Sequence, residues 1–262
     1  MGLESLDINK NSGTRYQSQM VSFQSPRGAA PKVSCNSCNM REICIPMGLK
    51  HEELERLSSL IAVRKRVKKG AALYRGGEEF TSLYAVRTGV FKTVVSAADG
   101  HDQVTGFHMA SDMMGLDGVH NHQHSSSAIA LEDSEVCVVP FGQLEDLSHD
   151  MPAFQHQLHR MMSREIVREH NAMLLLGSMR ADARLAAFLL DLIQRLTRRG
   201  YSSHQLVLRM TREEIGSYLG LKLETVSRMF SKFVEDGLIE VKLRDVRILK
   251  PDGLEAILHT HH

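Results

Sequence analysis

The stretch MTREEIGSYLGLKLETVSRMFSKFVEDGLIEV, residues 210–241, predicts two short helices joined by a tight turn. Thr211 followed three positions later by Glu214 is a capping box, which starts a helix. Gly220 is suited to end that helix, and a second helix follows within a few residues. This spacing is typical of a helix-turn-helix. The residues that we expect on the buried faces of the two helices are Ile215, Leu219, Val226, Phe230 and Phe233.

In a helix-turn-helix, the N-terminal part of the second helix enters the major groove of DNA. Arginine can bond O6 and N7 of guanine, and glutamate can accept from the amine of cytosine, so such a face can discriminate bases. Plain helix packing with a solvated polar face is the alternative, but LIEVKLRDVRILKP, residues 238–251, predicts a β-hairpin that would serve as a wing. We expect base contacts from Glu224, Thr225, Ser227 and Arg228, and phosphate contacts from Lys232 and Arg212.

The region from Leu54 to Pro140 predicts a β domain, because short β-rich runs alternate there with glycines. SLYAVRTGVFKTVV and SEVCVVP are examples of these runs. Regularly spaced short strands favour a β-barrel or jelly roll over alternating β and α units. The basic run RKRVKK, residues 64–69, lies far from the helix-turn-helix, so we expect a solvated strand face there and no DNA contact.

Between these two regions, AFQHQLHRMMSREIVREHNAMLLL, residues 153–176, predicts a long helix without Gly or Pro. A stripe with 4-3-4-3 spacing follows it, which is the spacing of a seam between paired helices. The alternative is that the stripe faces the core of the β domain. Glu169 argues against that alternative, because an unpaired buried carboxylate is costly. The predicted dimer seam consists of Met162, Ile166, Glu169, Met173 and Leu176.

Composition limits the remaining possibilities. The net charge of +1 requires any nucleic-acid surface to be local, and the absence of Trp gives little support to a stacking platform for single strands. No run of eighteen apolar residues occurs, so the sequence predicts no membrane span. The first thirty residues are polar and lack the apolar core of a secretory signal. We therefore expect a cytoplasmic protein with no membrane partner and a disordered tail over residues 1–32.

Three of the four cysteines lie in CNSCNMREIC, residues 35–44, and the fourth is Cys137. In a reducing cytoplasm, grouped cysteines are more often metal ligands or redox groups than disulfides. A C-x2-C-x5-C loop completed by a distant cysteine is compatible with an iron-sulfur cluster, whose usual ligands are thiolates. A structural zinc site is the alternative, although zinc sites usually consist of two short cysteine pairs.

The chain resembles the CRP/FNR transcription regulators over residues 33–250, and within them the FNR branch. The similarity is carried by CNSCNMREICIP, SLYAVRTG, QVTGFHMA, LLLGSMRADARLAAFLL and MTREEIGSYLGLKLETVSR. It implies an α+β chain with an N-terminal β-roll sensor domain of the jelly-roll type, a long dimerisation helix and a C-terminal winged helix-turn-helix. It also implies one 4Fe-4S cluster, and the ligands would be Cys35, Cys38, Cys44 and Cys137.

The resemblance further implies a homodimer that binds a palindromic operator in double-stranded DNA. Glu224, Ser227 and Arg228 would contact the bases of the inverted repeat, and the loop around Asp99–Asp102 would face RNA polymerase. The corresponding domain boundaries are residues 33–150 for the cluster loop and β-roll, 151–180 for the dimerisation helix and 181–262 for the DNA-binding domain. The expected function is oxygen-sensing regulation of anaerobic-metabolism genes, with no enzymatic activity; the alternative is a zinc-stabilised regulator that does not respond to oxygen.

One stretch departs from the wider family. Cyclic-nucleotide binders of this fold resemble one another in a Gly-Glu motif followed by an Arg-Ser pair that clamps the phosphate. Here GLDGVHNHQHSSSAIAL, residues 115–131, has Asp117 and no arginine, so we expect no cyclic-nucleotide effector. The stretch also contains His120, His122 and His124, which we expect in a solvated polar loop and not at a metal site.

Overall fold

The computed structural model describes residues 35–36, 38–61, 63–96 and 100–259. The predicted tail over residues 1–32 lies outside this part of the chain. Within it, two four-stranded antiparallel sheets form the predicted β-roll. One sheet has the order β1 (Val63–Val67), β8 (Ser134–Pro140), β3 (Ser82–Thr88) and β6 (Met113–Met114). The other has the order β2 (Ala72–Tyr74), β7 (Ser127–Ala130), β4 (Val90–Ser96) and β5 (Asp102–Met109).

The inside of the roll is apolar because alternate strand residues point inward. Phe91 and Met114 are fully buried there, together with Val86 and Val136. The tight β3–β4 turn needs Gly89, whose φ is +90° and at which a Cβ would lie 2.0 Å from Ser134 Oγ. Glycine is therefore the residue that lets the two strands turn against β8.

The outer face of the β1-β8-β3-β6 sheet carries a second apolar cluster. Helices α1 (His51–Leu60) and α2 (Phe141–Asp150) cover this face, together with the turn-rich segment that precedes α1. Leu83 and Val139 of the sheet pack there against Leu57, Leu144 and Phe154. Cys137 lies in β8, as predicted, and its side chain belongs to this outer cluster.

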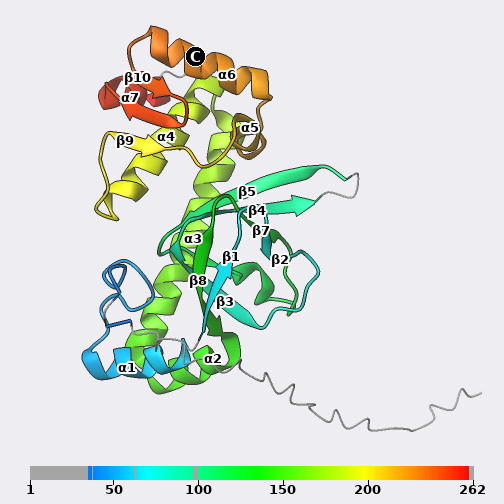
Figure 1. Ribbon diagram of the computed structural model, residues 1–262, viewed down its shortest axis with the longest axis vertical. Coiled ribbons are helices and arrows are strands. Elements are labelled where there is room, and N and C mark those ends of the chain that lie inside the picture. Colours follow the sequence, from blue (N-terminus) through cyan, green and yellow to red (C-terminus); the bar gives the residue numbers. More distant parts are fainter. Residues whose placement is uncertain (1–34, 37, 62, 97–99, 260–262) are drawn as a thin grey trace, which may run out of the picture. The chain divides into compact units, whose positions relative to one another are not determined.

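Helix α3 (Pro152–Ser178) is the predicted long helix, and Figure 1 shows it running beside the roll towards α4 (Ala181–Thr197). Pro152 at its first position fits the helix start, where a backbone N–H has no helical acceptor. The five residues of the predicted seam are all exposed, with Ile166 at 50% and Met173 at 68%. The alternative that this stripe faces the β-domain core is therefore wrong.

The C-terminal part is the predicted winged helix-turn-helix. Helices α5 (Arg212–Leu219) and α6 (Leu223–Glu235) are followed by the hairpin of β10 (Ile239–Lys242) and β11 (Asp245–Ile248). Strand β9 (Gln205–Val207) extends the hairpin to three strands in the order β10-β11-β9. Helix α7 (Pro251–His259) was not predicted; it packs against α4.

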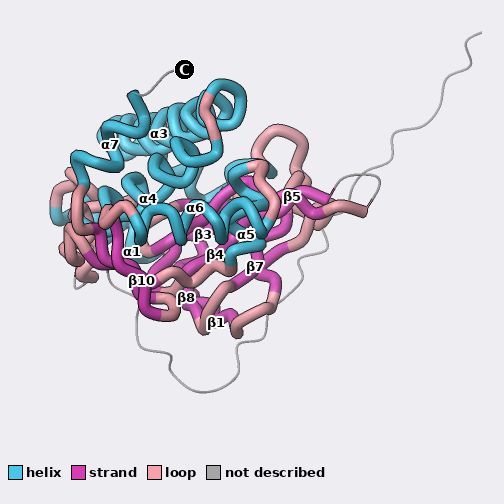
Figure 2. Tube along the Cα trace, turned by 90° about the horizontal axis from the view of Figure 1, so that it is seen from above, coloured by secondary structure: helices cyan, strands magenta, loops and turns pink. Residues whose placement is uncertain are grey.

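The roll and the C-terminal part share one core. Val94, Val104 and Phe107 of the β4–β5 pair belong to the same apolar cluster as α4, α5 and α6. The ring of Tyr218 lies 5.3 Å from that of Phe107 and 5.8 Å from that of Phe188, centroid to centroid. Figure 2 shows α5 beside β5, where the Ser217 hydroxyl accepts from the Val104 amide at 2.9 Å. The first helix of the helix-turn-helix is thus docked on the β-roll.

Candidate functional site

The helix-turn-helix is fixed by local contacts of the kind that its sequence predicts. Thr211 Oγ1 accepts from the Glu214 amide at 3.1 Å, and Glu214 Oε2 accepts from the Thr211 amide at 2.7 Å. Gly220 ends α5 in the left-handed region with φ +62°. At Gly216, a Cβ would lie 2.6 Å from the Leu221 carbonyl oxygen, so only glycine allows the turn to pack this closely on α5. These contacts set the position of α6.

Helix α6 buries one side and exposes the other. Val226, Phe230 and Phe233 are buried, as predicted. Glu224, Ser227, Arg228 and Lys232 are exposed and Thr225 is half-buried, with its hydroxyl 3.4 Å from Arg228 Nη2. The structure therefore brings the predicted base-contacting residues to the exposed side of the helix; their contact with DNA stays a prediction.

Arg212 is half-buried, whereas Lys232 is exposed. Its guanidinium stacks on the ring of Phe230 at 3.1 Å from the centroid, and burial lowers its pKa to about 10. Atom Nη1 is buried without a hydrogen-bond partner among the described residues. In this conformation Arg212 joins α5 to α6, and this packing competes with the phosphate contact that the sequence suggested. That contact stays a prediction.

The cysteine loop meets the roll at the outer apolar cluster. Cys35, Cys44 and Cys137 all belong to that cluster, although Cys137 comes from β8 and the other two precede α1. The Cys35 amide donates to Ser58 Oγ at 3.0 Å, which ties the loop to α1. The Cys44 amide donates to the Met40 carbonyl at 2.9 Å within a run of turns. The fold thus draws distant thiols towards one place.

Cys35, Cys44 and Cys137 all have raised pKa values, which favours the protonated thiol. Burial, reinforced by the neighbouring thiols, raises the pKa of Cys44 to about 12 and that of Cys137 to about 11. The pKa of Cys35 is raised for the same reason. In the described part of the chain, no three His, Cys, Asp or Glu side chains are arranged to hold one metal ion. The donor set is nevertheless suited to a thiophilic cation, because a cation offsets the negative charge that burial disfavours on these thiols.

Comparison with known proteins agrees with this architecture. Residues 64–150 match the model of the cyclic nucleotide-binding domain, and residues 183–257 match that of the Crp-like helix-turn-helix domain. The chain is 46% identical over 224 residues to the transcriptional regulatory protein btr of Bordetella pertussis, covering 86% of this chain and 93% of that protein. The chain belongs to the CRP/FNR family of transcription regulators.

Two further relatives illustrate the membership. The fumarate and nitrate reduction regulatory protein of Salmonella typhimurium is 41% identical over 231 residues, which cover 88% of this chain and 92% of that protein. The solved structure of FixK2 from Bradyrhizobium japonicum superposes with a TM-score of 0.70 at 29% identity, covering 76% of this chain and 98% of that one. CRP/FNR proteins are DNA-binding regulators and not enzymes. None of the helices that the structure describes is long and apolar enough to cross a membrane.

The stretch at residues 115–131, which lacks the arginine of the cyclic-nucleotide binders, is held together by Asp117. Asp117 Oδ2 accepts from the backbone amides of Ser125 and Ser126 at 3.0 and 2.9 Å, and from the Ser126 hydroxyl at 2.8 Å. His124 approaches Asp117 Oδ1 at 3.3 Å and stacks on Tyr74 with 3.7 Å between ring centroids. His124 is buried, so the expectation of a solvated loop is wrong for this histidine, whereas His120 and His122 are exposed.

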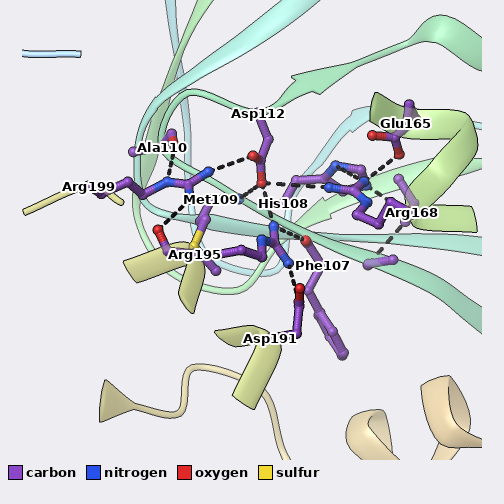
Figure 3. Close-up of polar contacts among 12 residues, drawn as sticks. Phe107, His108, Met109, Ala110, Asp112, Glu165, Arg168, Asp191, Arg195 and Arg199 are labelled. Carbon is purple, nitrogen blue, oxygen red and sulfur yellow. Dashed lines mark hydrogen bonds and ion pairs between the residues drawn. The ribbon is translucent and has the colours of Figure 1, made fainter. Parts of the chain in front are cut away.

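A buried ion network that sequence reasoning missed joins α3, α4 and the roll (Figure 3). Asp112 accepts from Arg195 at 2.5 Å and from Arg199 at 2.6 Å, and Arg168 of α3 lies 3.9 Å away. Burial acts to raise the pKa of Asp112, but the three arginines outweigh it and hold the pKa at about 2. Arg195 lies in the last turn of α4, and Arg199 lies in the turn directly after the helix. Their four-residue spacing was the available signal, since residues four positions apart lie on one side of a helix.

His108 completes this network as a neutral group. Arg168 Nη2 lies 3.3 Å from His108 Nδ1, and His108 Nε2 lies 3.2 Å from Thr93 Oγ1. Because a guanidinium only donates, Nδ1 is the acceptor and Nε2 carries the proton. Burial and the charge of Arg168 lower the pKa of His108 to about 3. Helix α3 is therefore bonded to the inside of the β-roll.

Proposed function

We propose that this chain is an oxygen-responsive regulator of the FNR type. Its Cys35, Cys38, Cys44 and Cys137 would hold a 4Fe-4S cluster in the absence of oxygen. The observation that carries the proposal is the meeting of Cys35, Cys44 and Cys137 in one apolar cluster. When bound, the group would supply cationic iron to these thiols and make their ligation sensitive to oxygen.

The steps that link cluster binding to DNA binding depend on residues of the chain itself. Ligation would fix the loop that precedes α1, and that loop shares the outer cluster with Phe154, Leu158 and Met161 at the start of α3. We infer that this favours a homodimer through the exposed apolar side of α3. Sequence reasoning had found part of that side; Val167, at 53% exposure, and Leu174, at 61%, extend it. A dimer would present two α6 helices to half-sites about one helical turn apart.

The contacts of Asp117 bear on the effector, and the name of a relative bears on the target genes. No cyclic nucleotide is expected, because Asp117 already takes the amide and hydroxyl donors that a phosphate would need. The name of the Salmonella relative refers to fumarate and nitrate reduction, which agrees with a role in anaerobic metabolism. RNA polymerase would contact the loop around Asp102; Asp99 lies outside the described residues.

Metal analysis of protein prepared without air tests the proposal. We expect about four irons and four sulfides per chain, lost on exposure to air. Changing any one of the four cysteines to serine, Cys137→Ser included, should abolish the oxygen-labile absorption. One zinc per chain and no iron would instead support the second candidate, a zinc-stabilised regulator insensitive to oxygen. A full cluster in the Cys137→Ser protein would remove Cys137 from the ligand set.

A further inference from the structure

Arg64 and Cys137 lie directly opposite each other in the antiparallel β1–β8 pair. Opposite residues in such a pair project from the same face of the sheet, with Cβ atoms about 5 Å apart. For Cys137 that face is the outer one, where it packs with Cys35 and Cys44. On its other side, β3 places Ala85 opposite Cys137. The strand neighbours of the fourth thiol are therefore one cation and one methyl group.

The Arg64 side chain has unused hydrogen-bonding capacity. Its Nε is buried without a hydrogen-bond partner in the described part of the chain. Glu135 Oε1 lies 3.7 Å from that Nε, which is an ion-pair distance but too long for a hydrogen bond. The same oxygen already accepts from Arg87 Nη1 at 2.8 Å. A buried N–H left without an acceptor is unfavourable, so the arrangement is suited to an acceptor that the protein chain does not supply.

The charge of Arg64 also has the sign that a thiolate site needs. Four thiolates around a 4Fe-4S core, or around one divalent ion, carry a net negative charge, and burying that charge beside an apolar cluster is costly. Arg64 is close enough to Cys35 and to Cys137 for its charge to act on both sulfurs. Arg87 also lies near Cys137, but Arg87 is engaged by Glu135.

We propose that Arg64 is a positioning residue for the metal group. Its Nε donates to the Cys137 sulfur or to a sulfur of the bound group, and its charge offsets part of the negative charge of the site. This inference rests on the proposed function, because it assigns Arg64 to the same four thiols. Hydrogen bonds and charges next to such sulfurs set the reduction potential and the stability of an iron-sulfur group.

The same strand offers a matched control. Arg66 is 89% exposed and lies 3.6 Å from Glu135 Oε2, so it shares the ion pair of Arg64. Its cross-strand partner is Glu135 and not a cysteine. Arg66→Gln therefore removes one arginine from the same strand and the same carboxylate without touching the thiol site. Arg64→Lys keeps the charge but loses the Nε donor.

The test compares Arg64→Gln, Arg64→Lys and Arg66→Gln with the unmodified protein after anaerobic cluster reconstitution. Iron and sulfide are counted, folding is checked by circular dichroism, and the reduction potential is measured. We expect a more negative potential for Arg64→Gln, partial return in Arg64→Lys and no change in Arg66→Gln. A folded Arg64→Gln protein that takes up no cluster, with uptake restored in Arg64→Lys, also supports the proposal. An unchanged potential in Arg64→Gln, or equal shifts in both glutamine variants, overturns it.

Failure of the proposed function gives a different result. If the unmodified protein takes up no iron and sulfide, the 4Fe-4S assignment is wrong, and the role of Arg64 is then decided by titrating the metal-free protein with Co²⁺. Thiolate-to-cobalt absorption reports binding to the four cysteines. We expect Arg64→Gln to bind Co²⁺ several-fold more weakly than Arg66→Gln and the unmodified protein. Equal affinities overturn the inference.

Discussion

Lys92 on β4 and Glu214 on α5, 122 positions apart in the chain, form an ion pair with 2.8 Å between Nζ and Oε1. The two side chains are only 20% and 18% exposed. Glu214 is also the residue that caps α5 through the Thr211 amide. The β-roll therefore bonds the same carboxylate that caps the first helix of the DNA-binding motif, which ties the position of α5 to the β4–β5 pair.

Lys92→Met should loosen this contact. Burial acts to raise the pKa of Glu214, and the hydrogen bond from Lys92 is the strongest effect that lowers it, so Glu214 loses its main compensation. Because the pair is partly exposed, we expect the free energy of unfolding to fall by about 1–3 kcal/mol. Urea unfolding measures the loss, and hydrogen exchange should show faster exchange in α5.

Lys68→Met is the control for that prediction. Lys68 pairs with Asp133 at 2.6 Å, but the two side chains are 84% and 63% exposed. An exposed pair contributes little to stability, because water screens the two charges. Equal losses in the two variants would show that the contact between Lys92 and Glu214 has no special role.

We predict that protonation of His108 makes the folded protein less stable in mild acid. The pKa of about 3 in the folded protein lies below the unfolded value, so neutral His108 contributes fully to the free energy of unfolding above about pH 6.5, and this contribution is lost as the pH falls. The free energy of unfolding should fall by about 1.4 kcal/mol per pH unit for one proton. The depressed pKa of Asp112 adds a second loss only below about pH 4. Urea midpoints between pH 7 and pH 5 should drop for the unmodified protein and drop less for His108→Gln. The exposed His120→Gln serves as the control, and the same slope in all three proteins would contradict the prediction.

Arg228 and Lys232 should differ in how they affect DNA binding. Arg228→Ala should cost about 1–3 kcal/mol at the specific site and relax the preference at one base pair, because it removes a base contact. Lys232→Ala should weaken specific and scrambled sites alike and reduce the salt dependence by about one counterion. Fluorescence anisotropy at several salt concentrations separates the two. If Arg228→Ala weakened both kinds of site equally, Arg228 would not contact a base.

We predict that repulsion between Glu169 side chains disfavours the homodimer. It is exposed on α3 between Ile166 and Met173 of the seam. In a two-fold dimer the two Glu169 carboxylates can meet and repel each other. Allosteric couplings of about 1–3 kcal/mol suffice to shift a close balance between monomer and dimer. Glu169→Ala should therefore dimerise and bind its operator in air, without a cluster, whereas Glu169→Asp keeps the charge and should stay monomeric. Sedimentation of the air-exposed proteins decides this; a monomeric Glu169→Ala protein would show that repulsion is not what separates the chains.

Local patterns in the sequence were sufficient for the elements whose formation depends on near neighbours. The capping box of Thr211 and Glu214, the turn at Gly220 and the buried side of α6 depend on residues at most a few positions apart. The cysteine spacing, together with family resemblance, predicts iron-sulfur chemistry, and this stays a proposal. Periodicity also marked the α3 seam, because a helix places residues at 3–4 positions on one side.

Tertiary structure alone decided the contacts between distant segments. The register that sets Arg64 opposite Cys137, the burial of His124 and the meeting of Asp112 with Arg195 depend on which strands pair and which helices dock. A shift of one residue in the β1–β8 register would turn Arg64 to the opposite face from Cys137. Register and domain docking are fixed by the packing of the whole apolar core, so the basic run at residues 64–69 gave no local sign that one of its arginines lies beside a thiol.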